Sequence, residues 1–374
     1  MPFGDEGREH GIGIALSGGG FRATLFHAGA LWRLNQLGYL PRIDRISSIS
    51  GGSITAGCLA VRWEHLHFEN NQALNFESET IAPLRSFCSR NIDILAVGIG
   101  ALLPGKSISA MVQEAYEDHL LGEVDLQSLP ERPRFVFNAT NFATGVSFRF
   151  SKPYAGDYRI GLIEKPTIRV SFAVTASSAF PPVLSPAVLE LDPNSFKKVE
   201  GADLYDQVSY RKRLVLTDGG VYDNLGLETV WNRYDTVLVS DAGAPFDSDS
   251  GFDARVDRQV MRALDITTNQ ARALRKRALV ADFEAKACMG AYWGIMTEIS
   301  RYQLADALPV PDEKTQELAS IRTRLNRFSE SEQCQLINWG YAVCDAAMRR
   351  HVLESPPVVP PAWPYPDYAL DRIV

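Results

Sequence analysis

Apolar runs and glycine-rich turns alternate over the first part of the chain. Residues 12–16 are a short apolar run that ends at Ser17-Gly18-Gly19-Gly20, which is typical of a buried strand that enters a tight turn. Leucine and alanine then recur at three-residue steps over residues 25–37, which indicates a helix. A second β-rich run, over residues 43–49, meets Gly51-Gly52 and another helical pattern. Two strand–turn–helix units in series predict a parallel sheet with helices on its faces.

The rest of the chain extends this pattern without a repeat or a clean linker. Further strands are predicted over residues 134–139, 146–150, 213–217 and 236–240. A long helical pattern over residues 252–283 gathers mostly apolar positions on one face, namely Val256, Val260, Leu264, Thr267, Ala271, Leu274 and Ala278. Prolines dominate the chain after residue 355 and predict an extended arm.

These elements predict a three-layer α/β/α fold with a central, mostly parallel sheet. We expect a core over residues 1–250, a helical elaboration packed on it over residues 251–354, and a proline-rich tail over residues 355–374.

Composition and charge narrow the class of protein. The 374 residues are 45% apolar or aromatic, which excludes a mainly disordered chain. A net charge of −7 is unfavourable for a general nucleic-acid binder, so we expect no nucleic acid as partner. Five widely spaced cysteines without a CxxC pair suggest neither a zinc site nor a disulfide framework, and fit reduced thiols in the cytosol.

No stretch has the character of a membrane span or a leader. The first ten residues are polar and charged, unlike a secretory signal. The longest apolar run, residues 92–104, is shorter than the roughly 20 residues needed to cross a bilayer. It could form a mobile apolar flap that lines a channel or touches the bilayer, or it could belong to the core. We therefore expect a cytoplasmic protein, soluble or peripheral at the inner membrane.

Three motifs carry candidate chemistry, and the first is a serine in a strand-to-helix turn. Gly52-Ser53 follows the second strand, where a sharp turn exposes a serine hydroxyl as a nucleophile. A helix N-cap is the structural alternative for Ser53. Ser50 is a weaker candidate, because no glycine directly precedes it.

The second motif is the glycine loop Gly18-Gly19-Gly20, which Arg22 follows closely. Successive glycines leave amides free at a helix N-terminus, where they can bind an anion or stabilise an oxyanion. Phosphate-loop motifs do not fit, because the loop lacks both a Gly-Lys-Ser/Thr sequence and the GxGxxG spacing.

The third motif is Asp218-Gly219-Gly220, at the end of a predicted strand. Active sites of α/β proteins form at such ends, although an aspartate in a structural turn would look similar. Asp241 also ends a β-like run and is the rival candidate.

Along the chain the glycine loop comes first, the serine turn second and the aspartate motif last. In this chain order and at these separations, the three motifs resemble the bacterial-type patatin-like phospholipases, which are related to the cytosolic phospholipase A2 catalytic domain. The resemblance covers about residues 10–245 and includes the segment 176–182 before the aspartate. One departure is the serine motif, usually GxSxG, where the fifth position counted on Ser53 is Thr55 and the next glycine is Gly57.

The resemblance implies a lipid acyl hydrolase that acts through a Ser–Asp dyad and an acyl-enzyme. Ser53 would be the nucleophile and Asp218 its base, and Gly18, Gly19 and Gly20 would form the oxyanion hole. Arg22 would bind the headgroup phosphate, with a salt bridge that anchors the loop as the alternative. No cofactor and no metal are implied. His27 is expected to be a partly buried helix residue, not part of a triad.

Other functions stay open at this level. The substrate could be a membrane phospholipid or a soluble acyl ester. The protein could also be a regulated effector of an antiviral or stress system, switched on by a nucleotide signal or partner bound to its C-terminal third. A phospholipid membrane surface is the expected partner, and a homo-oligomer and a small-molecule activator remain open.

Overall fold

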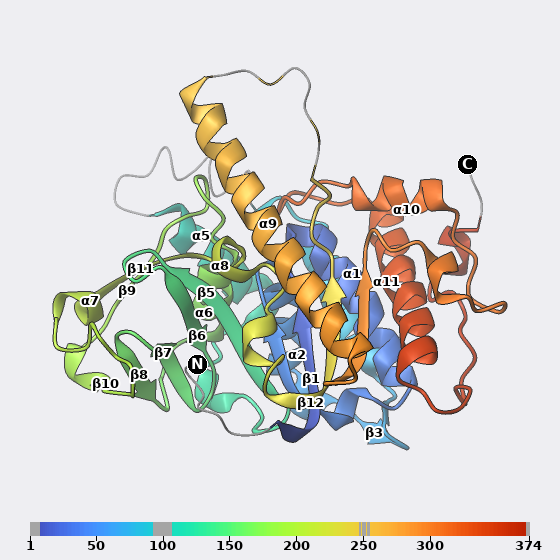
Figure 1. Cartoon of the computed structure of the whole chain (residues 1–374), viewed down its shortest axis with the longest axis horizontal. Helices are drawn as coiled ribbons and strands as arrows, with labels where there is room; N and C mark the ends of the chain where they lie inside the picture. The colour runs from blue at the N-terminus through green and yellow to red at the C-terminus, as the bar shows by residue number, and fades with distance from the viewer. Residues whose placement is uncertain (1–7, 93–106, 247, 249–251, 253–254, 372–374) are drawn as a thin grey trace.

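The computed structural model of the chain describes residues 8–92, 107–246, 248, 252 and 255–371 (Figure 1). The main sheet comprises β1 (Glu9–Leu16), β2 (Ile43–Ser48), β5 (Arg134–Asn141), β6 (Val146–Phe150), β7 (Tyr154–Asp157), β8 (Gly161–Glu164), β9 (Ala187–Glu190), β10 (Phe196–Lys197), β11 (Arg213–Asp218), β12 (Tyr234–Asp241) and β13 (Met289–Gly294). The two short strands β3 (Phe68–Glu69) and β4 (Gln72–Ala73) pair separately. The α-helices are α1 (Gly20–Gln36), α2 (Gly51–Val61), α3 (Ala82–Cys88), α5 (Ile108–Tyr116), α6 (Val170–Ser178), α7 (Ser209–Lys212), α8 (Gly220–Asp223), α9 (Val256–Glu284), α10 (Asp312–Ala319) and α11 (Glu330–His351).

The sheet is mixed, with a parallel centre and an antiparallel extension. Strands β5, β2, β1, β12 and β13 lie side by side and run parallel. Beyond β5 the order continues antiparallel through β6, β7, β8 and β10, while β11 pairs antiparallel with β5. The carboxyl ends of β1 and β2 therefore lie at one edge, where α/β proteins place their binding sites.

Both faces of the sheet are covered. Along β1, Ile14 and Leu16 face the larger apolar cluster, which also holds residues of α1, α2, α6 and α11. Ala15, between them, faces a second cluster that includes Leu279 of α9. Because successive side chains of a strand point to opposite faces, these two clusters make the three layers predicted from the sequence.

Helix α9 departs from the expected amphipathic packing. Leu279 is its only buried residue among those the structure describes. Val256, Val260 and Leu274, three of the apolar positions predicted to share a face, are more than half exposed. The N-terminal part of α9 extends beyond the layers, so it has no sheet surface on which to bury that face (Figure 1).

The C-terminal third is part of the same core. Strand β13 extends the central sheet parallel to β12, so this region is not purely helical. Helix α11 packs against α1 so closely that a Cβ on Gly340 would lie 1.8 Å from the Phe26 carbonyl oxygen. The proline-rich tail lies on this pair of helices, where the Asn338 side chain donates to the carbonyls of Tyr365 and Tyr368.

Two sequence expectations concern membranes. Among the described residues, no helix is long and apolar enough to cross a bilayer. The apolar run expected as a flap or core segment falls almost wholly on residues 93–106, which lie outside the described part of the chain.

Candidate active site

The turn between β2 and α2 places a serine in a strained conformation. Ser50 has φ 50° and ψ −120°, outside the regions that non-glycine residues favour. A serine held in this way, directly before a helix, is the feature of a nucleophile elbow. Its amide is fixed by the carbonyl and the hydroxyl oxygen of Ser177, at 3.2 and 3.1 Å.

Ser53 lies one turn further along α2 and does not line the pocket beside Asp218. Its side chain is fully buried, and its hydroxyl is hydrogen-bonded to the hydroxyls of Ser48 and Ser177, at 2.9 and 2.8 Å. The structure thus does not bring together the Ser53–Asp218 pair expected from the sequence. The serine beside Asp218 is Ser50.

A sequence signal for Ser50 exists. Counted on Ser50, the run Ser48-Ile49-Ser50-Gly51-Gly52 matches GxSxG except that Ser48 replaces the first glycine. The last glycine is needed, because a Cβ on Gly52 would lie 2.5 Å from the Leu16 carbonyl oxygen. The apparent absence of the last glycine, with Thr55 in its place, came from counting the motif on Ser53.

Asp218 ends β11 and points into the same space as Ser50. Its Oδ1 accepts a hydrogen bond from the Gly220 amide at 2.7 Å, while its buried Oδ2 has no hydrogen-bond partner among the described residues. Burial raises the pKa of this carboxyl to about 7, although the Gly220 amide and the nearby Ser50 hydroxyl both favour the charged form. A carboxyl with a pKa near neutrality suits a general base.

The segment 176–182 connects the two turns. The carbonyl of Ser177 accepts hydrogen bonds from the amides of both Ser50 and Gly219. The carbonyl of Ala179 accepts from the amide of Asp218, at 3.0 Å. The end of α6 therefore fixes the serine turn and the aspartate turn relative to each other.

The glycine loop lies on the other side of Ser50. Gly19 and Gly20 have φ values of 142° and 55°, which require glycine. The Gly18 amide is already used, since it donates to the carbonyl of Asn224 at 3.1 Å. No described residue accepts a hydrogen bond from the amides of Gly19, Gly20 or Gly51, so these three donors remain available for a ligand.

Arg22 does not line the pocket in which headgroup binding was expected. It is 1% exposed, and burial beside Arg272 lowers the pKa of its guanidinium to about 10. The guanidinium donates to the carbonyls of Ala319, Ile321 and Ala242. Arg22 therefore anchors the start of α1 to the end of α10 and to the segment after β12. It does so through carbonyl oxygens and, among the described residues, not through the salt bridge that was the alternative expected from the sequence.

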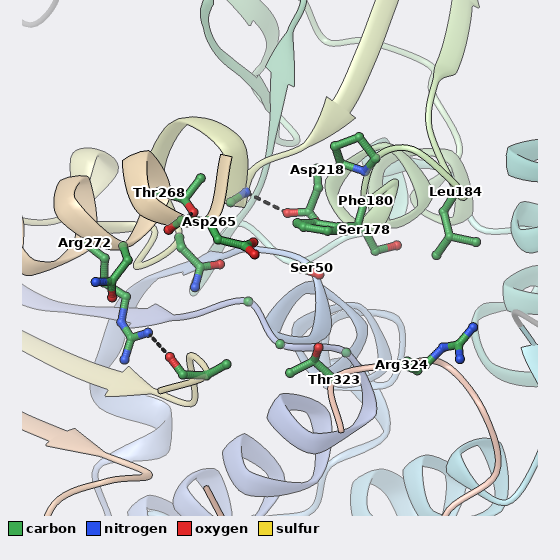
Figure 2. Close-up of a pocket in the computed structure, with 18 of the residues that line it drawn as sticks. Ser50, Ser178, Phe180, Leu184, Asp218, Asp265, Thr268, Arg272, Thr323 and Arg324 are labelled. Atoms are coloured by element: carbon green, nitrogen blue, oxygen red, sulfur yellow. Dashed lines mark hydrogen bonds between the residues drawn. The ribbon is translucent and has the colours of Figure 1, made fainter. Parts of the chain in front are cut away.

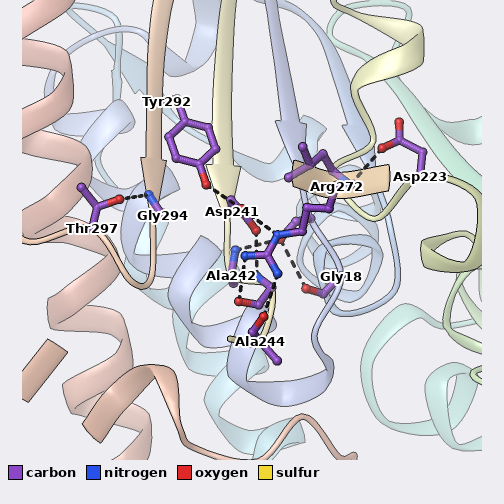
Figure 3. A network of polar contacts seen from close by, with 12 residues as sticks. Gly18, Asp223, Asp241, Ala242, Ala244, Arg272, Tyr292, Gly294 and Thr297 are labelled. Carbon is purple, nitrogen blue, oxygen red and sulfur yellow. Dashed lines mark hydrogen bonds and ion pairs between the residues drawn. The ribbon is translucent and has the colours of Figure 1, made fainter. Parts of the chain in front are cut away.

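Asp241, the rival aspartate, belongs to a buried polar network (Figure 3). Its Oδ2 accepts from Arg272 and Tyr292 at 3.1 and 2.6 Å, and its Oδ1 accepts from the Gly243 amide. Burial alone would raise the pKa of this carboxyl, but Arg272, Tyr292 and Gly243 together lower it. With both oxygens occupied, Asp241 holds α9 on the sheet and is not placed to take a proton from Ser50.

His27 lies in α1, as predicted, but it is fully buried and not partly buried as expected. Its ring nitrogens are hydrogen-bonded to the Ser240 hydroxyl at 2.7 Å and the Ser17 carbonyl at 3.0 Å. Burial lowers the pKa of His27 to about 4, so the ring is neutral at physiological pH.

Ser50, Asp218 and the glycine loop open into one cavity of about 550 Å³ (Figure 2). Phe180, Pro181, Val183 and Leu184 form an apolar wall, and polar residues of α9 line the opposite end. Thr323, Arg324 and Leu325 close the cavity beside the glycine loop. Within the described residues, no group of three or more His, Cys, Asp or Glu side chains could hold a metal ion.

The fold and this pocket define an α/β protein whose binding site lies at the carboxyl edge of the parallel strands. The model of the family described as "Patatin-like phospholipase" matches residues 14–231, more than half of the chain. This chain belongs to the patatin-like phospholipase family, which supports a lipid hydrolase activity. No curated protein matches the sequence.

Solved structures of a human cytosolic phospholipase A2 share the fold. Human GIVD cytosolic phospholipase A2 in complex with methyl γ-linolenyl fluorophosphonate and terbium chloride is 16% identical, with a TM-score of 0.52 and coverage of 91% of this chain and 58% of that chain. The same human protein with the fluorophosphonate is 15% identical, with the same TM-score and coverage. VipD from Legionella pneumophila gives a TM-score of 0.36 at 13% identity, covering 92% of this chain and 67% of that chain. This chain thus spans less than two thirds of the human protein's length.

Proposed function

We propose that this protein is a lipid acyl hydrolase that cleaves acyl esters of phospholipids, with Ser50 as nucleophile and Asp218 as general base. The observation that carries the proposal is the position of Ser50: a strained serine that lines the same cavity as a buried carboxyl with a raised pKa. Ser53 has neither property, so Ser50 replaces it as the proposed nucleophile.

The proposed reaction has two steps. The Ser50 hydroxyl oxygen attacks the ester carbonyl carbon while its proton passes to Asp218 Oδ2, which has no hydrogen-bond partner among the described residues. Asp218 then protonates the departing alcohol as the ester bond breaks. Water, deprotonated by the same carboxylate, hydrolyses the acyl-enzyme and releases the fatty acid.

Backbone amides would hold the charge that develops on the carbonyl oxygen. The amides of Gly19, Gly20 and Gly51 have no acceptor among the described residues. Gly51 directly follows Ser50, and the residue after the nucleophile is a usual oxyanion donor at such an elbow. We therefore add Gly51 to the oxyanion donors and leave out Gly18, whose amide is already bound.

A lipid surface is the substrate source that the pocket favours. Phe180, Val183 and Phe246 line the cavity and are exposed, and Val256 and Val260 are exposed on the nearby end of α9. Apolar side chains around an opening can enter the interfacial region of a bilayer. The human structural relative was solved with methyl γ-linolenyl fluorophosphonate, whose long hydrocarbon chain is of the kind that an apolar wall could hold here.

The assignment is tested with a fluorophosphonate probe that reacts with activated serines. Wild type and Ser53→Ala should both be labelled, and Ser50→Ala should not, because only Ser50 has the base beside it. In parallel, mass spectrometry of phospholipid vesicles should show fatty acid released by wild type and Ser53→Ala but not by Ser50→Ala.

Ser53→Ala is a matched control, since it removes the same hydroxyl three residues away. Circular dichroism would verify that both variants fold. Labelling that persisted in Ser50→Ala and disappeared in a folded Ser53→Ala would overturn the proposed nucleophile. A wild type that released fatty acid from no phospholipid would overturn the proposed substrate.

A further inference from the structure

The cavity has two chemically different ends, with Ser50 and Asp218 between them. Figure 2 shows Leu184 on one side of Ser50 and Asp265 and Thr268 on the other. The apolar wall suits an acyl chain. The opposite end is lined by α9, which lies outside residues 14–231 matched by the family model.

Asp265, Thr268 and Asn269 line this end on successive turns of α9. Their spacing of three and four residues places them on one face of the helix. The side chains of Asp265 and Asn269 make no hydrogen bond or ion pair with any residue that the structure describes. The Thr268 hydroxyl donates to the Leu264 carbonyl at 2.8 Å, which leaves its oxygen able to accept.

Three charged side chains line this end of the cavity, and they differ in how many of their hydrogen-bonding groups are already used. The guanidinium of Arg272 is occupied by Asp241 and by the carbonyls of Gly243 and Ala244. Arg262 lines the same end, and its guanidinium carbon lies 4.2 Å from the ring centroid of Phe246. An ionised Asp265 carboxylate can only accept hydrogen bonds, so the face offers more acceptors than donors to a ligand.

We propose that Asp265, Thr268 and Asn269 form a headgroup subsite that selects phospholipids whose headgroup donates hydrogen bonds. A primary ammonium or a hydroxyl has the required donors, and a trimethylammonium has none. This inference rests on the proposed hydrolase function, and it names the substrate class that the same pocket would prefer.

The test compares headgroups at constant acyl chains in mixed micelles with an uncharged detergent. Phosphatidylethanolamine and phosphatidylcholine have the same net charge but differ in donors, and phosphatidylglycerol offers hydroxyls instead of an ammonium. We expect wild-type kcat/KM for a donating headgroup to exceed that for phosphatidylcholine by about tenfold, the scale of one hydrogen bond to a charged group.

Substitutions on α9 test whether the headgroup preference comes from the face formed by Asp265, Thr268 and Asn269. Asp265→Asn should reduce the ethanolamine-to-choline ratio toward one, since it removes the charge that an ammonium would meet, and Thr268→Val should reduce the glycerol-to-choline ratio. Asp257→Asn is the matched control, because it removes a carboxylate from the same helix outside the pocket, and should leave both ratios unchanged.

The outcomes separate this inference from the proposed function. If wild type hydrolyses all three lipids equally, or if both ratios survive Asp265→Asn and Thr268→Val, the subsite is overturned while the hydrolase stands. If only the ethanolamine ratio falls in Asp265→Asn, the preferred donor is an ammonium; if both ratios fall, the face recognises donors in general. A folded wild type that hydrolyses none of the lipids would overturn the hydrolase itself.

Discussion

Replacing Asp218 by asparagine should abolish most activity and yet make the fold more stable at neutral and alkaline pH. Burial raises the pKa of this carboxyl from 3.8 to about 7 in the folded chain. The unfolded chain keeps the ordinary value, so ionising Asp218 costs folding free energy. Asparagine has nearly the same shape and no charge, and its side-chain oxygen can still accept from the Gly220 amide.

The size of this change in stability follows from the linkage between proton binding to Asp218 and folding. Because the folded state binds the proton more tightly, the contribution of Asp218 to the free energy of unfolding is largest below the unfolded pKa of 3.8. It falls by about 1.4 kcal/mol per pH unit as the pH rises toward 7, which amounts to about 4 kcal/mol in all. The Asp218→Asn variant does not lose stability in this way, because asparagine does not ionise. Burying its amide group without an acceptor would cost about 1–3 kcal/mol at every pH. This cost is the same at every pH, so the change of the stability difference with pH reports the ionisation of Asp218 alone.

The assay is urea unfolding of wild type and Asp218→Asn between pH 4 and pH 9. The stability of the variant relative to wild type should increase by about 3 kcal/mol from pH 4 to pH 7 and level off by about pH 8. Wild-type kcat/KM should rise about tenfold per pH unit below pH 7 and level off above it, as expected for a base that must be ionised. In Asp218→Asn it should be at least about a hundredfold lower.

Asp241→Asn is the matched contrast, since Asp241 also ends a buried strand. Arg272, Tyr292 and Gly243 hold the pKa of Asp241 below its ordinary value, so its contribution to stability is present above the unfolded pKa and is lost as the pH falls. Removing one partner of a buried ion pair should destabilise the fold by about 3–5 kcal/mol at neutral pH. A stability difference between Asp218→Asn and wild type that did not change with pH would refute the reasoning about the buried carboxyl.

Two other substitutions test the loop and the core. Gly19→Ala forces a side chain onto φ 142° and places its Cβ 3.0 Å from the Ala242 carbonyl oxygen. Because one oxyanion donor would move, kcat should fall about a hundredfold while KM and the circular dichroism spectrum change little; unchanged turnover would make the loop a structural turn only. Gly340→Ala should lower the free energy of unfolding, measured with urea, by about 1–3 kcal/mol. The added Cβ would meet the Phe26 carbonyl oxygen and separate α1 from α11. Alanine normally favours a helix over glycine, so a gain in stability would contradict this close packing.

The sequence by itself determined the elements that local physics controls. The apolar run before Gly18 is β1, and the runs that begin at Ile43 and Arg213 are β2 and β11. Glycine loops at strand ends predicted where the backbone must turn sharply, and Asp218, singled out from the sequence, lines the cavity. These features depend on residues close together in the chain, so a pattern of apolar residues and glycines is sufficient to find them.

Tertiary structure decided which serine meets the aspartate. Ser50 and Ser53 are one helical turn apart, and both follow a strand and lie near glycines. Only the packing of β2, α2 and α6 places Ser50 in the strained conformation beside Asp218 and leaves Ser53 bonded to Ser48 and Ser177.

The same holds for charged and apolar side chains whose surroundings come from distant segments. Arg22 is an anchor because loops at Ala242 and Ala319, some two to three hundred residues away, offer it carbonyls. The apolar positions at the start of α9 are exposed because no sheet lies beneath that end of the helix. Burial and hydrogen bonding are properties of the packed chain, and sequence spacing along one element cannot fix them when the partners lie elsewhere.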